Sequence, residues 1–328
     1  MIKIARDFKN LSEQHRTKIL LDYDIETKLD VKIVNTIDPE KRFYEYLKTN
    51  INDILEKDIE YLKTTIIPSI DIILGVNYFD LRDHNDRRKK INKDKTKELI
   101  EIFDYTTFSE FNANKYNAYD LLEELEVNVC PYCNRQYINT IKPTSNIGGT
   151  RATLDHYLLK SKYPYLGLSF WNLVPSCYSC NSQLRTSRNI GLHPYQKGFD
   201  KILHFYTDID DITEYIGNTR KYFNLSLKEY KDLIPSQEDL ENASINEKVF
   251  RLNDIYQNHK EYVRKIIQCA IIYSKSFSKD LLKEYPEIFE NEEDAQSMML
   301  SFYTKKENYE EKPLAKLTHD IASELKLL

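Results

Sequence analysis

Two C-x-x-C pairs constrain the fold of this chain more than any other feature of its sequence. They are Cys130-Pro131-Tyr132-Cys133 and Cys177-Tyr178-Ser179-Cys180, separated by 43 residues. The short turn in each pair lets both thiolates point at one ion, and two pairs complete a tetrahedral four-cysteine zinc site. Such a closed site leaves no position for a substrate, so we expect one structural Zn²⁺ per chain, holding together a segment with little apolar core. A redox role is the alternative, but it needs only one pair in a thioredoxin-like setting.

The fifth cysteine and the N-terminal residues indicate the compartment. Cys269 lies far from both pairs. In a reducing cytosol, paired thiols indicate metal chemistry and not a disulfide framework. The start of the chain lacks the apolar core and the cleavage site of a signal peptide. No run of about eighteen apolar residues occurs, so no membrane-spanning helix is predicted. We therefore expect a cytoplasmic protein without a membrane partner.

Glycine and proline separate a central segment from its flanks. Five of the seven glycines and five of the ten prolines fall between residues 131 and 198, which predicts turns and short strands there. The flanks are nearly glycine-free and apolar at helical spacing, as in one stripe from Ile245 to Tyr273 that predicts a single helix. The expected fold class is α+β, with mostly helical flanking regions around a small zinc-stapled unit. The predicted domains are a helical region 1–126, a central domain 127–200 and a helical region 201–328.

Charge is distributed unevenly along the chain. Residues 130–200 carry eight basic and two acidic side chains, a net charge of +6, whereas the whole chain is −5 and the other residues therefore sum to −11. A basic island in an acidic chain is what a phosphate-handling site needs. A chance cluster of solvated lysines is the alternative. The negative total argues against a protein that coats nucleic acid indiscriminately.

A group of polar residues lies between and beside the cysteine pairs. Asp155 and His156 are adjacent, Asn172 stands nine residues before Asn181, and Asn181 directly follows Cys180. This order resembles the HNH signature in its H-N-N form. Phage junction resolvases of the same ββα-metal class share the order C-x-x-C, Asp-His, C-x-x-C-Asn. The resemblance covers about residues 130–195 and implies a metal-dependent endonuclease that hydrolyses phosphodiester bonds.

The chemistry of phosphodiester hydrolysis explains these residue types. One hard divalent ion can neutralise the scissile phosphate and stabilise the departing 3′ oxygen, and Asp155 and Asn181 offer oxygen ligands suited to Mg²⁺ or Mn²⁺. His156, when neutral, can take a proton from the attacking water. Asn172 would fix the loop that orients His156, by hydrogen bonds to the backbone.

Each of these residues also has an ordinary structural explanation. Asp155 could cap a turn and His156 could be a lone polar core residue. Asn172 could be a turn residue and Asn181 a helix N-cap. All four together, in register with a zinc knuckle, favour the catalytic interpretation.

Further residues are predicted to contact nucleic acid. The basic side chains near the site are placed to touch backbone phosphates. His193, in a proline turn, is a candidate for approaching the metal or the phosphate, and a structural histidine is an equal alternative. The predicted contacts are Lys160, Lys162, Arg185, Arg188 and His193.

The run from Lys160 to Cys177 also resembles HNH proteins of bacterial anti-phage systems. The most similar type is the nuclease subunit of Septu and of Septu-like retron systems, in which an ATPase partner controls the nuclease. No P-loop pattern occurs in this chain, so any ATPase would be a separate subunit. The resemblance implies an anti-phage effector that cleaves nucleic acid, with DNA favoured over RNA. We expect the helical flanks to regulate and recruit. The alternative is plain scaffolding, in which the flanks only bury the back of the catalytic unit.

Two other functions stay open at this point. A non-catalytic zinc-dependent module could bind DNA or a protein without cleaving it, although Asp155, His156 and Asn181 would then be unexplained. A toxin-like RNase would use the same fold on a different substrate. Metal-dependent nicking of a plasmid separates the first from a nuclease, and a parallel digest of total RNA separates the second.

Overall fold

Two sets of segments pack separately in the computed structural model, which describes residues 1–76, 78–79, 86–209, 211–215, 222–230, 235–273, 277–300 and 309–328. We call the first set the cysteine unit; it consists of Met1–Ala5, Val127–Ile138 and Ser176–Leu328. We call the second set the His156 unit; it consists of Arg6–Glu126 and Asn139–Pro175. The predicted central domain, 127–200, contributes residues to both units, and the three-domain division itself stays a prediction.

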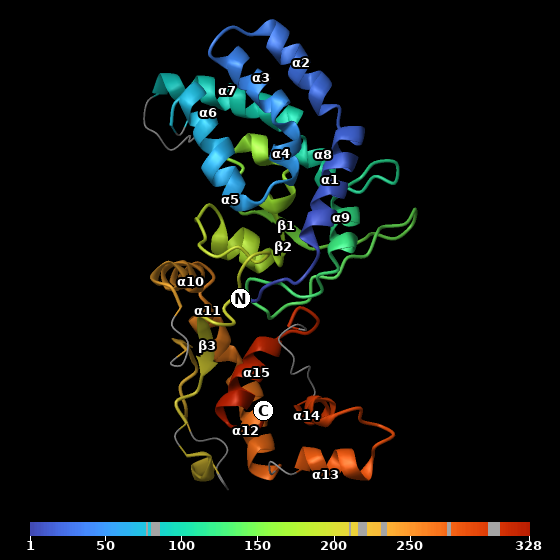
Figure 1. Ribbon diagram of the computed structural model, residues 1–328, viewed down its shortest axis with the longest axis vertical. Helices are drawn as coiled ribbons and strands as arrows, with labels where there is room; N and C mark the ends of the chain where they lie inside the picture. The colour runs from blue at the N-terminus through green and yellow to red at the C-terminus, as the bar shows by residue number, and fades with distance from the viewer. Residues whose placement is uncertain are drawn as a thin grey trace. The chain divides into compact units, whose positions relative to one another are not determined.

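The N-terminal part of the His156 unit is helical (Figure 1). Asp7 begins the first helix by accepting a hydrogen bond from the Asn10 backbone N–H at 3.4 Å. Asn117 and Asp120 form a capping box at the start of the last helix. The elements are α1 (Phe8–Asp22), α2 (Ile25–Asn35), α3 (Glu40–Thr49), α4 (Ile51–Glu56), α5 (Ile59–Tyr61), the π-helical η1 (Leu62–Ile66), α6 (Ile67–Leu74), α7 (Asp86–Ile102), α8 (Tyr105–Ser109) and α9 (Ala118–Leu125).

Strands β1 (Thr153–His156) and β2 (Leu173–Ser176) form a two-stranded sheet, most of which belongs to the His156 unit. Two short 3₁₀ helices, η2 (Pro164–Leu166) and η3 (Phe170–Asn172), lie in the connection between the strands. Helices α1 and α4 pack on η3, and α7 packs on η2. The connection is therefore covered by helices from the N-terminal part of the chain.

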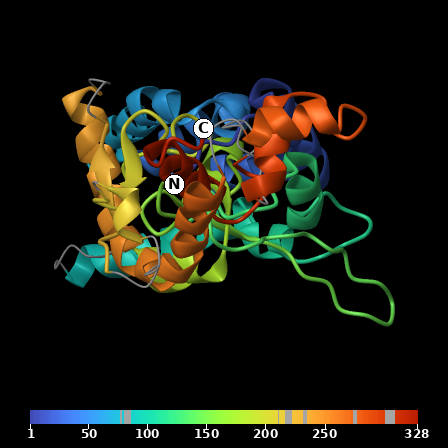
Figure 2. The same cartoon turned by 90° about the horizontal axis from the view of Figure 1, so that it is seen from below.

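A long loop precedes β1. It spans residues 139–152, extends away from the helices in Figure 2, and is closed by an antiparallel bridge between Ile141 and Thr150. Ile141 and Ile147 are 60% and 72% exposed, so the loop contributes little to the core. The predicted turn-rich character of the central segment is confirmed here.

The cysteine unit combines a small sheet with helices. Strands β3 and β4 are antiparallel, with Phe205 opposite Leu227, and α15 packs against β3 and α12 (Figure 1). The Phe205 backbone N–H donates to Asp320 of α15 at 2.9 Å. The elements are the π-helical η4 (Ser179–Arg185), β3 (Leu203–Tyr206), η5 (Ile212–Tyr215), β4 (Ser226–Glu229), α10 (Gln237–Val249), α11 (Leu252–Tyr256), η6 (Gln257–His259), α12 (Lys260–Ile272), α13 (Phe277–Glu284), α14 (Glu292–Leu300) and α15 (Ala315–Glu324).

The single helix predicted from the stripe between Ile245 and Tyr273 is wrong. Arg251 takes a left-handed backbone conformation, with φ of 49°, which ends α10 before α11 begins. A 3₁₀ turn then separates α11 from α12. Val263 and Ile266 are buried as the stripe predicts, whereas Ile245 is 42% exposed. Helical periodicity identified the apolar faces but not the breaks between the helices.

The predicted fold class is confirmed. Over the described residues the protein is mostly helical, with two small two-stranded sheets and a cluster of four cysteines. In the part of the chain that the structure describes, none of the helices has the length and apolar character that a membrane span requires.

Candidate metal centre and active-site strand

The four paired cysteines converge on one point in the cysteine unit. Cys130, Cys133, Cys177 and Cys180 are buried free thiols whose Sγ atoms all lie within 4.8 Å of one another. The Sγ atoms of Cys133 and Cys177 are 4.0 Å apart. Four sulfurs bound tetrahedrally to zinc at about 2.3 Å lie about 3.8 Å from each other, whereas a disulfide requires about 2.05 Å. The predicted convergence is confirmed, and the cluster fits one structural Zn²⁺.

Packing four thiols around one point changes their proton affinity. Hydrogen bonds from the neighbouring thiols, that of Cys130 first, hold the pKa of Cys177 well below its ordinary value. The thiol of Cys130 also lowers the pKa of Cys133. Burial raises the pKa of Cys130 itself, and the pKa of Cys180 is raised by its hydrogen bond with Cys130. The cluster therefore favours thiolate at two positions, and a bound divalent metal ion would favour thiolate at all four.

We call the turn of each C-x-x-C pair a knuckle. The first knuckle, which carries Cys130 and Cys133, turns sharply at Asn134, whose φ is 49°. Asparagine enters this left-handed region more readily than most residues. The Asn134 N–H donates to Cys130 O at 2.7 Å, and the Cys130 N–H donates to Gln136 O at 3.0 Å. An antiparallel bridge between Val129 and Tyr137 continues the turn. The backbone thus presents both thiols of the pair on the same side.

The same knuckle holds two C-terminal helices. The Tyr256 hydroxyl of α11 donates to Cys133 O at 2.6 Å. The Leu314 N–H donates to Asn134 O at 2.6 Å, and the Lys316 N–H of α15 donates to the Asn134 side chain at 3.0 Å. Because backbone and side-chain groups of the knuckle are the partners of α11 and α15, a metal ion that holds the knuckle also holds these helices.

The second knuckle leads into η4. The Cys180 N–H lies 3.4 Å from Cys177 Sγ, and the Asn181 N–H donates to Cys177 O at 3.1 Å. The Asn181 side chain is half-buried. Asn181 belongs to the cysteine unit, whereas Asp155 and His156 belong to the His156 unit. The approach of Asn181 to those residues stays a prediction.

His156 lies at the end of β1 and is half-buried. Its Nε2 is 3.0 Å from Gly167 O, and its ring meets the Tyr105 ring edge-on, at 4.5 Å between centroids and 71° between planes. A carbonyl oxygen can only accept a hydrogen bond, so the neutral ring carries its hydrogen on Nε2 and its lone pair on Nδ1. This tautomer is the one that a base acting through Nδ1 requires.

Asp155 precedes His156 on the strand and is 2% exposed. Successive side chains of a strand point to opposite faces, so Asp155 and His156 project from different faces of β1. Burial, with a contribution from the Asp155 charge, raises the pKa of the nearby Tyr105 to about 12. A buried carboxylate is costly unless it is paired or binds a cation. Its oxygen atoms suit a hard divalent ion.

Asn172 is fully buried and joins the two ends of the connection between β1 and β2. Its Oδ1 accepts from the Leu158 N–H at 2.6 Å. Its Nδ2 donates to Leu158 O at 3.1 Å and to Leu166 O at 3.0 Å. These are the backbone hydrogen bonds expected of a loop-fixing residue, and they hold the segment that contacts His156. The part of Asn172 in catalysis stays a prediction.

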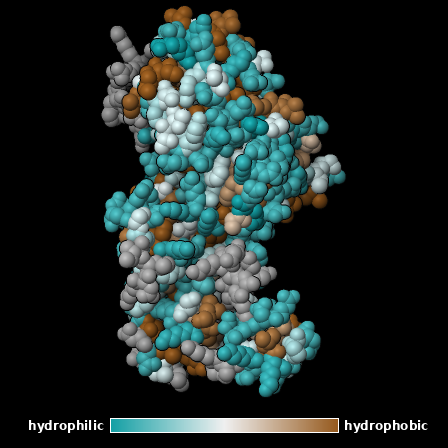
Figure 3. Space-filling model, in the orientation of Figure 1, coloured by the Kyte–Doolittle hydropathy of each residue, from teal (hydrophilic) through white to brown (hydrophobic). Residues whose placement is uncertain are grey.

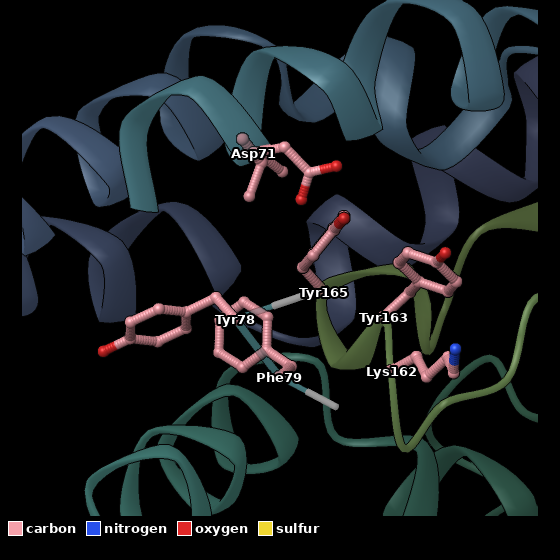
Figure 4. Close-up of a pocket in the computed structure, with 7 residues that line it drawn as sticks. Asp71, Tyr78, Phe79, Lys162, Tyr163 and Tyr165 are labelled. Carbon is pink, nitrogen blue, oxygen red and sulfur yellow. The ribbon is translucent and has the colours of Figure 1, made fainter. Parts of the chain in front are cut away.

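Lys160 and Lys162 also lie in this connection. The Lys160 ammonium is 4.8 Å from the centre of the Tyr105 ring, and burial lowers its pKa. Lys162 lines a small pocket whose other walls are largely aromatic (Figure 4). The lining residues are Ile70, Asp71, Tyr78, Phe79, Lys162, Tyr163 and Tyr165. None of them is a predicted catalytic residue, so this pocket is distinct from the Asp155–His156 strand end.

The predicted phosphate contacts of the cysteine unit differ in exposure. Arg188 is exposed and donates to Leu184 O. Arg185 has no exposed surface and His193 is 2% exposed. His193 Nδ1 accepts from the Tyr195 N–H at 3.1 Å, which places the hydrogen of the neutral ring on Nε2. Burial of Arg185 and His193 fits a structural role better than an open phosphate-contacting surface.

Sequence reasoning missed three groups around His156: Tyr105, Gly167 and His15. Tyr105 packs against the ring, Gly167 provides its hydrogen-bond acceptor, and His15 binds the next carbonyl, Leu168 O, at 2.8 Å. Nothing in the sequence marks Tyr105 or Gly167. His15 did carry a signal, because α1 buries Phe8, Ser12, His15 and Ile19 at helical spacing and a histidine on such a face needs a polar partner.

Comparison with known proteins finds no family model, no curated relative and no solved structure that matches this chain.

Proposed function

We propose that this protein is a metal-dependent HNH endonuclease that hydrolyses phosphodiester bonds. Asp155 and Asn181 hold a catalytic Mg²⁺ or Mn²⁺ ion, His156 is the general base, and Asn172 fixes the loop that orients it. The ion, when bound, neutralises charge on the scissile phosphate and stabilises the departing 3′ oxygen. The four cysteines hold a separate, structural Zn²⁺, for which their convergence within 4.8 Å is the support.

The observation that carries the proposal is the hydrogen bond between His156 Nε2 and Gly167 O, at 3.0 Å. It selects one tautomer and leaves Nδ1 as the basic nitrogen. In the reaction, Nδ1 takes the proton from the water that attacks phosphorus. The Tyr105 ring against the imidazole limits its rotation, which keeps Nδ1 in one direction.

DNA is the favoured substrate, and defence against phage is the proposed role. The basic island at 130–200, in a chain of net charge −5, supports contact with a polyanion. The defence role is carried by the resemblance to Septu-type HNH proteins alone. An RNase with the same fold is distinguished by offering plasmid DNA and total RNA to the same preparation, with cleavage of RNA alone as its signature.

The test compares plasmid nicking by wild type, His156→Ala and His204→Ala in Mg²⁺. His204 is a half-buried histidine of β3 in the cysteine unit, whose ring lies 4.5 Å from that of Tyr230, and serves as the matched control. We expect His156→Ala to keep its fold and zinc while nicking falls by about 10²–10⁴-fold, the usual loss of an acid–base group. EDTA should stop the wild type, and Mg²⁺ without zinc should restore it. Near-normal nicking by His156→Ala would contradict the assignment.

A zinc-dependent binding module that does not cleave is the second candidate, because the cysteine cluster supports it without any catalytic residue. It predicts binding of duplex DNA in a gel-shift assay, with no product in Mg²⁺ or Mn²⁺. Asp155→Ala separates the two, since it should abolish metal-dependent cleavage by a nuclease and leave binding by a module unchanged.

A separate ATPase subunit belongs to the proposal as a regulatory partner. Helix α2 buries Ile25 and Leu29 but leaves Val31 and Val34 55% and 83% exposed, and Ile37 beyond its end is 82% exposed. Figure 3 shows apolar side chains reaching the surface among the hydrophilic ones. Contiguous exposed apolar side chains often mark a protein-binding surface. Co-purification of the products of the native operon should yield a hetero-complex, and a monomer that binds no neighbouring gene product contradicts this part.

A further inference from the structure

Three consecutive backbone carbonyl groups between β1 and β2 each accept a hydrogen bond from a different side chain. The pairs are Asn172 Nδ2 to Leu166 O at 3.0 Å, His156 Nε2 to Gly167 O at 3.0 Å, and His15 Nε2 to Leu168 O at 2.8 Å. Two of these side chains belong to the proposed active site. The third side chain is that of His15 in α1. His15 lies 153 positions before Leu168 in the sequence.

His15 is placed in an environment where a polar ring is costly. It has no exposed surface, and the rings of Phe108 and Phe170 lie 5.9 Å and 5.6 Å from it. Burial lowers its pKa to about 4, so the ring is neutral at physiological pH. Its Nδ1 is 3.3 Å from the Tyr116 hydroxyl, and its Nε2–H donates to Leu168 O. An apolar side chain would fill this space at lower cost, so the hydrogen bond to Leu168 O accounts for the histidine.

We propose that His15 is a positioning residue for His156. By holding Leu168 O it fixes the peptide segment whose neighbouring carbonyl, Gly167 O, holds the imidazole of the base. The inference deepens the proposed nuclease function and rests on it for its catalytic consequence. It also makes α1, in the helical flank, part of the support of the active site.

The position of Gly167 is constrained from the other side as well. A Cβ atom at this residue would lie 3.2 Å from Pro164 O and 3.4 Å from Phe103 O, so the backbone packs closely there. Adjacent Cα atoms are about 3.8 Å apart, so a displaced Leu168 carries Gly167 with it. A shift of about 1 Å at a catalytic group can lower a rate by about 10²-fold. If Leu168 O loses its hydrogen bond to His15, the backbone displacement therefore passes to Gly167 O, and so to His156, through one peptide unit.

The test uses three variants of the full zinc-loaded chain. His15→Leu removes the donor at similar volume, and His15→Gln keeps an N–H donor near the position of Nε2. Ser12→Ala is the control, because Ser12 is buried on the same helix face but bonds only to Lys9 O of its own helix, at 3.0 Å. The ¹⁵N resonances of the His156 ring report which nitrogen carries the hydrogen, with or without activity.

We expect wild type, His15→Gln and Ser12→Ala to hold His156 with its hydrogen on Nε2. His15→Leu should give a mixture of tautomers and about a tenfold lower kcat for plasmid nicking, with KM unchanged. Unchanged His156 resonances in folded His15→Leu overturn the proposal. If the leucine variant does not fold, His15→Asn replaces it, since its shorter amide cannot reach Leu168 O, and wild-type resonances in that variant overturn the proposal equally. A wild type that cleaves nothing ends the nuclease function but leaves the tautomer measurement decisive for positioning.

Discussion

The four-cysteine centre and the surroundings of His156, at the end of β1, are built in opposite ways. The centre uses four identical ligands from two short turns, Cys130–Cys133 and Cys177–Cys180, brought within 4.8 Å of one another. His156 is a single side chain whose surroundings come from α1, α8 and the connection between β1 and β2. One ion can hold the centre, whereas the proposed base, His156, depends on several hydrogen bonds that each contribute about 1 kcal/mol.

This difference predicts two kinds of failure. Loss of one cysteine removes the ion on which the whole centre depends, so the cysteine unit should lose its structure in one step. Loss of one group near His156 should weaken the His156 unit by a few kcal/mol and leave the fold in place. Three measurements, from the largest expected effect to the smallest, test whether the two regions differ in this way.

The largest effect is expected for Cys177→Ser. Zinc binding to structural sites contributes about 10–16 kcal/mol in small zinc domains at neutral pH, more than the stability of most folded units. Bound zinc should fall from about one per chain to near zero by metal analysis. Trypsin should then cleave within the cysteine unit after Arg251, which directly precedes α11, and after Lys316 of α15. Both helices bond to the first knuckle.

Cys269→Ser is the matched control for this experiment. Cys269 is half-buried on α12 and lies outside the cluster. It should keep its zinc and its resistance to trypsin. A zinc-free Cys177→Ser protein that is as protease-resistant as the wild type would show that the cysteines do not hold the unit together.

A smaller loss is expected for Asn172→Ala. The side chain is fully buried and makes three hydrogen bonds to the backbone of Leu158 and Leu166. Each buried group left without a partner costs about 1–3 kcal/mol, so the free energy of unfolding should fall by about 3–5 kcal/mol. Asn224→Ala, which removes an exposed hydrogen bond to Asp208, should cost less than about 1 kcal/mol. If denaturant titrations show the same loss of unfolding free energy for Asn172→Ala and Asn224→Ala, Asn172 does not hold the connection between β1 and β2 together.

The pH dependence of stability gives the smallest expected effect. The pKa of His15 is about 4 in the folded protein, mainly because of burial, against an ordinary value of 6.5. Between these values the unfolded chain binds a proton that the folded chain does not, so stability rises with pH. The contribution of neutral His15 is complete above pH 6.5 and is lost as the pH falls to about 4. The difference corresponds to about 3 kcal/mol.

The measurement compares wild type with His15→Gln, which has no titrating ring at this position. The groups around His15 are the Tyr116 hydroxyl and the charge of Lys18, and Glu124 contacts both; all three are present in either protein. Their titration therefore cancels in the comparison. Between pH 4 and 6.5 the wild type should lose stability more steeply. Parallel curves would mean that His15 keeps its ordinary pKa.

The sequence alone predicted what depends on local spacing. Two cysteines three positions apart can share an ion whatever surrounds them, so the four-cysteine centre was predictable and is confirmed. Apolar periodicity predicted the helical flanks for the same reason, since one buried face needs only the repeat of the helix. The spacing did not predict where the helix between Ile245 and Tyr273 breaks. Arg251 takes the left-handed backbone conformation there, and the sequence has no glycine at this position that would have indicated it.

Only the tertiary structure decided the surroundings of those residues. Arg185 and His193, predicted to contact phosphate, are buried, because exposure depends on which segments pack over a side chain and not on its charge. The tautomer of His156 depends on Gly167 O, and Leu168 O is held by His15 of α1. A motif names the residue that reacts, but its orientation comes from backbone groups brought near it by long-range packing, and one sequence carries no distance between positions 15 and 168.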